Sequence, residues 1–204
     1  MQIINLKHKS MRKLVLGAAM LLFAQFSFGQ AVSDQAVIPV SVTLNSILRL
    51  TIVSGGNIQF VVNTIDEYED GITTSARYQT AFNVASSRNF DVMINAETAT
   101  FFGTDNVANT MPLNNVGYQC QTVAGGGTFP ADAAMVGLAM APTYLIGGAL
   151  AGDKRPAGGS ATNQFIIEWE LGTSLGTMNA GSLLSQSIDP DNYVVNVFLV
   201  VDPE

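Results

Sequence analysis

The chain has 204 residues, of which 48% are hydrophobic and 12% are charged, and nine basic and sixteen acidic residues give a formal net charge of −7. This acidic balance argues against nucleic acid as a partner, because contacts to phosphate need clustered Lys and Arg. It also argues against adhesion to anionic lipid head groups. The single cysteine, Cys120, excludes an intrachain disulfide.

Residues 1–29 have the three parts of a secretory signal peptide: a basic head, a short apolar run and small residues before the cleavage site at Gln30. The apolar run is roughly 15 residues long, shorter than the about 20 residues of a bilayer-spanning helix. The parts are Lys7, Lys9, Arg12 and Lys13, then Leu14–Phe28, then Ser27 and Gly29 at positions −3 and −1.

Removal of this segment takes four of the nine basic residues and leaves five against sixteen acidic ones, a net charge of −11. We therefore expect one mature domain, residues 30–204, without a membrane span. The expected location is secreted: the periplasm, the outer cell surface or the medium of a Gram-negative-type bacterium.

Beyond Gln30 the dominant hydrophobic period is two, which is typical of half-buried strands. The predicted strands are 40–44, 48–53, 58–62, 77–85, 90–94, 116–123, 165–171 and 193–201. Residues 54–57 predict a turn, and the polar residues 86–89 predict a hairpin connection. This pattern predicts an all-β protein with a single antiparallel, immunoglobulin-like β-sandwich.

Two stretches do not follow the strand pattern. Residues 129–151 are rich in Ala, Gly and Met, and 131–140 could form a short helix. A loop or helix that covers a sandwich edge is favoured there over a binding lid. Residues 147–160 contain Gly, Ala, Pro156 and the pair Lys154-Arg155, and they predict an exposed, mobile loop.

The sequence contains almost no catalytic constellation. Its one histidine, His8, lies in the signal segment, which excludes histidine-based triads and histidine-ligated zinc from the mature chain. Glu168 and Glu170 share one strand face and are a conceivable pair for glycoside chemistry, but exposed acids on an outer strand face are commonplace. We therefore expect no enzyme.

The densest charge cluster offers oxygen ligands for Ca²⁺, the one cofactor that the sequence suggests. It comprises Asp66, Glu67, Glu69 and Asp70. The favoured interpretation is a solvated loop, because these neighbouring acids point in different directions. The stretch 189–192 predicts a turn that feeds the last strand.

Aromatic residues could stack on sugar rings, and Tyr68 and Tyr144 are the candidates because both are expected in loops. Trp169 shares its strand parity with Phe165, so a core role is favoured for it. Cys120 is expected to be a buried, unreactive thiol, since no basic residue surrounds it in the sequence.

The chain resembles the pilin-like, immunoglobulin-type sandwich proteins of bacterial surfaces, which include pilus subunits and spore-coat-U-like domains. The segments that carry this resemblance are Val40, Val42 and Leu44, then Leu48–Ile52, Gly55–Phe60, Phe90–Ile94, Thr110–Leu113 and Asp191–Tyr193.

The resemblance implies an exported structural or adhesive subunit that is assembled outside the inner membrane. In chaperone-usher members of the group, an N-terminal extension completes the sheet of the next subunit. Residues 31–44 would be that arm here, with Val40, Val42 and Leu44 as its assembly residues. The alternative is that the arm is the first strand of its own domain.

Two functional hypotheses follow. The first is a non-enzymatic, secreted structural or adhesive protein of the cell surface, whose partners are copies of itself or other surface proteins. The second is a monomeric module that binds carbohydrate or Ca²⁺ around Asp66, Tyr68 and Asp70.

Overall fold

The computed structural model describes residues 38–124, 134–148, 150 and 153–203. The predicted signal peptide, residues 31–37 of the predicted arm and residues 131–133 of the predicted helix lie outside the described residues. The chain divides into two units, Met1–Thr43 and Leu44–Glu204. In the first unit, the described residues 38–43 form no strand or helix, and the elements below all belong to the second.

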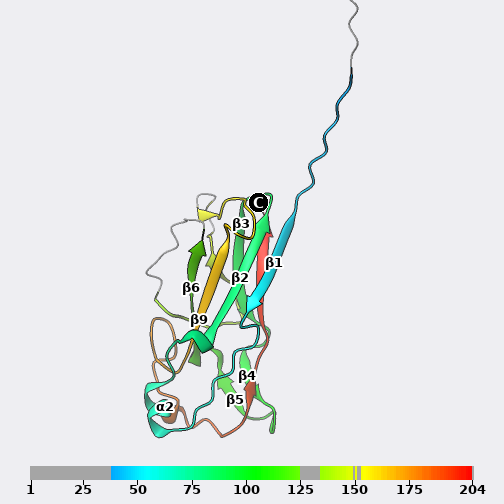
Figure 1. The fold of residues 1–204 in the computed structure, drawn as a ribbon. Helices are drawn as coiled ribbons and strands as arrows, with labels where there is room; N and C mark the ends of the chain where they lie inside the picture. Colours follow the sequence, from blue (N-terminus) through cyan, green and yellow to red (C-terminus); the bar gives the residue numbers. More distant parts are fainter. Residues whose placement is uncertain (1–37, 125–133, 149, 151–152, 204) are drawn as a thin grey trace, which may run out of the picture. The chain divides into compact units, whose positions relative to one another are not determined.

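The described residues from Leu44 onward form an all-β sandwich of antiparallel sheets, which confirms the predicted all-β sandwich (Figure 1). The larger sheet has the strand order β1 (Leu48–Ser54), β2 (Gln79–Ser86), β9 (Gln164–Leu171), β6 (Val116–Ala124) and β7 (Val136–Gly137). The opposing sheet has the order β11 (Val197–Pro203), β3 (Phe90–Ala96) and β8 (Thr143–Ile146).

A third sheet has the order β10 (Tyr193–Val194), β4 (Thr100–Gly103) and β5 (Thr110–Pro112). Its strand β4 follows β3 in the chain, and β10 precedes β11, so this sheet prolongs the β11-β3 pair toward one end of the sandwich. The predicted strand 193–201 is therefore found as two strands, which are separated by Val195 and Asn196.

The core lies between the facing sheets, and its residues follow the predicted alternation. In β2 every second side chain is buried, because successive residues of a strand point to opposite faces. In β9 the same alternation runs from Gln164 to Trp169, and Glu170 is buried as well. The innermost side chains are Phe82, Val84, Phe90, Val92, Ile94, Phe165 and Ile167, all at most 1% exposed. The rings of Phe82 and Phe165 stack at 5.2 Å between centroids.

Trp169 is buried as predicted, and its indole Nε1 donates a hydrogen bond of 3.0 Å to Thr80 Oγ1. This bond matters because a buried N–H without an acceptor would destabilise the fold. It ties β9 to β2 across the larger sheet.

One side of the sandwich is closed by the chain itself. The described segment 134–146 passes from β7 in the larger sheet to β8 in the opposing sheet, and β6 contacts β8. Leu138 and Ile146 are buried on the way, and Ala96 N donates to Ala139 O. The described part of the predicted helix 131–140 is thus the short strand β7 with extended chain, and the helix is wrong for residues 134–140.

The expected hairpin at residues 86–89 is also wrong, because β2 and β3 lie in different sheets. The Ser86 hydroxyl accepts from Arg88 N and donates to Arg88 O, which holds the reversal. Such a local signal reverses the chain without deciding which strand becomes the partner.

Residues 58–62 form no strand, contrary to the prediction. Their alternating apolar side chains pack against the core from an irregular segment, in which Phe60 stacks on Tyr78 at 4.4 Å. The preceding turn is found as predicted, with Gly55 at φ +66°, and the Thr80 hydroxyl donates to Gly55 O.

The acidic stretch 66–70 is helical rather than a loop: α2 spans Ile65–Asp70. Its first turn closes with a capping box, in which Thr64 Oγ1 accepts from Glu67 N and the Glu67 carboxylate accepts from Thr64 N. This reciprocal pair explains why six residues with several acids become helical.

Candidate functional site

The side of the sandwich opposite β7 and β8 is bounded by β1 and β11, the edge strands of the two facing sheets (Figure 1). We call these two strands and the space between their inward side chains the open side. Within the described residues, no strand pairs with the far edge of either β1 or β11. Each strand therefore presents a row of backbone N–H and C=O groups without ladder partners.

The inward side chains of β1 are only partly covered. Leu50 and Ile52 stand opposite Val84 and Phe82, so both point to the core face of the sheet. Val84 and Phe82 are 0% and 1% exposed, whereas Ile52 is 41% exposed and Leu50 is half-buried. The core thus loses its cover as it reaches this strand.

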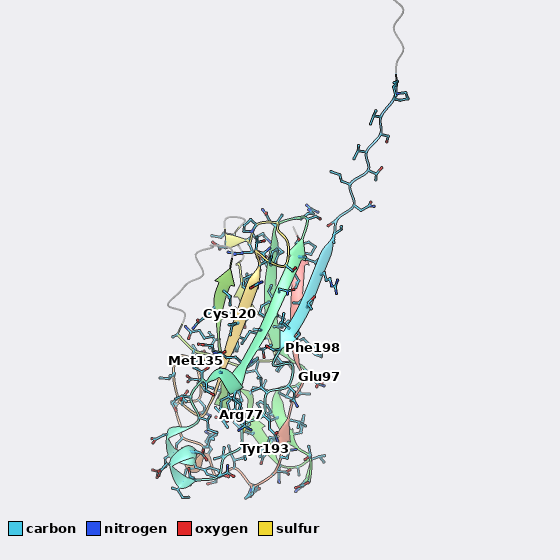
Figure 2. All side chains as sticks on the ribbon, in the orientation of Figure 1. Arg77, Glu97, Cys120, Met135, Tyr193 and Phe198 are labelled. Carbon is cyan, nitrogen blue, oxygen red and sulfur yellow. The ribbon has the colours of Figure 1, made fainter. Side chains whose placement is uncertain are left out.

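The inward side chains of β11, in the opposing sheet, are also only partly covered. Leu199 and Val201 stand opposite Ile94 and Val92, which are almost fully buried, yet both are half-buried themselves. The outward side chains of β11 are apolar too: Phe198 and Val200 are each 45% exposed. Figure 2 labels Phe198 at this edge of the domain.

The three assembly candidates precede β1. Val40, Val42 and Leu44 are 83%, 76% and 90% exposed, and residues 38–47 form no strand. The predicted strand 40–44 is therefore absent. The apolar side chains that alternate with polar ones in this segment are not buried by any other described residue.

The calcium candidates do not converge. Asp66, Glu67, Glu69 and Asp70 all lie on α2, and Glu67 accepts hydrogen bonds from Asn63 N at 2.6 Å and Thr64 N at 3.0 Å. These two backbone donors lower the pKa of Glu67, the Asn63 bond having the larger effect. Among the described residues, no three His, Cys, Asp or Glu side chains are grouped so that they could hold a metal ion.

The aromatic candidates Tyr68 and Tyr144 lie apart from each other and outside loops, contrary to the prediction. Tyr68 is on α2, half-buried against the core cluster. Tyr144 lies in β8 opposite Met93 of β3, on the outer face of its sheet, and is 45% exposed.

Glu168 and Glu170 do not form a pair with free carboxylates. Glu168 accepts from the side-chain amides of Gln79 and Gln121. Glu170 is buried and accepts from Thr74 N and the Thr173 hydroxyl. Both carboxylates are thus engaged in fixing neighbouring strands and loops.

Cys120 is half-buried in β6, and burial raises the pKa of its thiol to about 12. A thiol with such a pKa carries almost no thiolate at neutral pH, which is the reactive form. This agrees with the predicted inert thiol.

Two basic residues of the expected exposed loop 147–160 are not exposed: Lys154 is partly buried and Arg155 is buried. The Lys154 ammonium lies 2.6 Å from Asp91 Oδ2, with side-chain exposures of 16% and 3%. Arg155 is 4% exposed, its Nε donates to Asn163 Oδ1, and its backbone pairs with Phe90 of β3. The sequence feature that could have indicated this burial is that Lys154 and Arg155 are adjacent in a chain with few basic residues.

A turn around Asp191 is found as predicted, and its role is larger than expected. The Asp191 carboxylate accepts from Asp105 N, Asn106 N, Asn109 Nδ2 and Asn192 N, which joins the turn after β4 to the start of β10. These bonds lower the pKa of Asp191, with that from Asp105 the largest.

No family model matches this chain, and no curated protein is significantly similar to it. No helix among the described residues is long and apolar enough to cross a membrane.

Proposed function

We propose that this protein is a secreted, non-enzymatic surface subunit of the pilin-like, immunoglobulin-type group, and that copies of it join through the open side. The observation that carries the proposal is the incomplete cover of inward-facing residues on both β1 and β11. An apolar strand supplied by a second copy would cover Ile52, Leu199 and Val201 and pair with the free backbone edge.

The strand orders support the immunoglobulin-type assignment. Immunoglobulin-type sandwiches have strands A, B, E and D in one sheet and C, F and G in the other. In sheet order, β1, β2, β9 and β6 would take the places of A, B, E and D, while β3 and β11 would take those of C and F. The place of strand G is the far edge of β11, where the described residues provide no strand.

Residues 38–44 of a neighbouring copy have the properties that such a strand needs. Val40, Val42 and Leu44 share one face of an extended chain, so all three would enter the open side together. Ser41 and Thr43 would face solvent. Pro39 is compatible with an edge position because it lacks only one backbone donor.

The first test compares the solution mass of residues 30–204 with that of residues 45–204 by light scattering. Large oligomers that vanish in the shorter chain support a donated arm. A monomeric long form whose shortened version unfolds would instead assign the arm to its own domain, and the assembly proposal would be abandoned.

A pair of substitutions distinguishes insertion of a specific strand from non-specific hydrophobic association. Val42→Asp places a charge on the face that enters the neighbour, and we expect it to abolish the oligomers. Thr43→Asp adds the same charge one residue away on the opposite face, and we expect it to leave them intact. Equal effects of both substitutions would contradict a strand inserted with this parity.

A further inference from the structure

A polar cleft of about 470 Å³ lies beside the third sheet, and nothing in the proposed assembly uses it. Its walls are β5 with the two residues before it, Asn179, the segment 186–189, and Tyr193 of β10. Its volume falls within the roughly 300–1,000 Å³ of small-molecule sites. None of its lining residues belongs to β1 or β11.

The wall at residues 179–189 is held rigidly. Gln186 Oε1 accepts from Asn115 Nδ2 and Asn179 Nδ2, and Gln186 Nε2 donates to Asn115 Oδ1 and Gly181 O. Asn115 is fully buried, so this amide network anchors the loop to the core. A rigid wall reduces the ordering cost of binding a ligand.

Three polar side chains in the cleft are exposed and remain available to a ligand. The Thr110 hydroxyl, the Ser187 hydroxyl and the Asp189 carboxylate line the cleft, and none of them bonds to another described residue. Ser187 has φ +53°, a region that residues other than glycine seldom adopt.

Tyr193 supplies the aromatic surface of the cleft. Its hydroxyl donates to Asp189 O at 2.6 Å, which fixes the ring against the segment 186–189. Figure 2 shows Tyr193 toward the end of the domain that carries α2 in Figure 1.

We propose that this cleft binds a neutral saccharide. Sugar hydroxyls donate to a carboxylate and exchange hydrogen bonds with Ser and Thr hydroxyls, while the C–H face of a sugar ring packs on an aromatic ring. The described residues that line the cleft include no Lys or Arg, which disfavours an anionic ligand. An apolar ligand would leave Thr110, Ser187 and Asp189 without hydrogen-bond partners.

The test is calorimetric titration of the mature chain, residues 30–204, with maltohexaose, mannohexaose and xylohexaose. Concentrations up to about 10 mM detect the millimolar dissociation constants of weak sites. Hexagalacturonate and chitosan hexamer serve as anionic and cationic comparisons. We expect binding of at least one neutral hexaose, with reduced hydrogen exchange in residues 186–193.

Two variants locate the site. Asp189→Asn removes the charged acceptor, and we expect about a tenfold weaker affinity, typical for a hydrogen bond to a charged group. Ser187→Gly removes the hydroxyl while keeping a residue that tolerates the left-handed backbone, and it should weaken binding as well. Asp153→Asn, an exposed carboxylate outside the cleft, is the matched control and should leave the affinity unchanged.

The proposal is overturned if none of the neutral hexaoses binds, if only a charged oligosaccharide binds, or if Asp189→Asn and Ser187→Gly bind as well as the unaltered chain. Light scattering of the same samples reports assembly separately, so failure of the saccharide site leaves the proposed assembly untouched.

Discussion

The buried ion pair between Lys154 and Asp91 gives the sharpest test of the fold. Lys154→Met removes the ammonium and leaves the Asp91 carboxylate, 3% exposed, without its counter-ion. Its other oxygen, Oδ1, has no hydrogen-bond partner among the described residues. Removing one partner of a buried pair costs about 3–5 kcal/mol. Because Lys154 is 16% exposed and water can enter beside it, we expect the lower end, about 3 kcal/mol.

Urea unfolding, followed by the fluorescence of the single Trp169, measures this loss directly. The control is the double variant Asp91→Asn/Lys154→Met, in which no uncompensated charge remains. It should recover at least about 1 kcal/mol relative to Lys154→Met, since an unpaired neutral amide costs less than an unpaired carboxylate. If Lys154→Met loses less than about 1 kcal/mol, or the double variant is no more stable, the buried-pair reasoning is refuted.

Three further outcomes are expected. Gly55→Ala should lower stability by about 2 kcal/mol or more, because Gly55 has φ +66° and a Cβ there would meet the carbonyl oxygen of Gln79; Gly56→Ala, which meets only Ile52 Cγ2 at 3.6 Å, is the control for the melting temperature. Glu67 has a lowered pKa in the folded state, so its contribution to stability is present above the ordinary pKa and is lost as the pH falls through the folded value; Glu67→Gln should therefore flatten the melting-temperature profile on the acid side, and an unchanged profile would contradict the capping role. Cys120, with a pKa raised to about 12, should react much more slowly with a disulfide reagent at about pH 8 in the native protein than after urea unfolds the chain; equally rapid reaction of the native protein would contradict the raised pKa.

The sequence predicted the strands that have one buried face, because a period of two directly encodes which side chains turn inward. It failed for residues 58–62, where the same alternation belongs to an irregular segment whose Phe60 stacks on Tyr78. The apolar residues there do face the core, but nothing in the pattern tells whether a neighbouring backbone is available for pairing. Strand β9 has such neighbours on both sides, in β2 and β6.

The wrong prediction for Lys154 and Arg155 has a similar cause. Lys154 and Arg155 were expected in solvent because basic residues in a Gly-rich stretch usually lie there. Their actual partners are far away in the chain: Asp91 and the backbone of Phe90, both in β3. The cleft could not be predicted either, because its polar walls come from Thr110, Ser187 and Asp189, which only the strand order brings together.

The two sides of the sandwich differ in how well their apolar side chains are covered. The net negative charge of the protein determines how association through the less covered side depends on salt. On one side, residues 134–146, which include β7 and β8, close the sandwich and bury Leu138 and Ile146. On the other side, Ile52 of β1 and Phe198 and Val200 of β11 are exposed. An uncovered apolar edge invites pairing with another chain. The excess of acidic over basic residues opposes association, because copies of the protein repel each other. Salt screens this repulsion but leaves strand pairing and apolar burial in place. Assembly through the open side should therefore strengthen as salt is raised, whereas an assembly held by complementary charges would weaken.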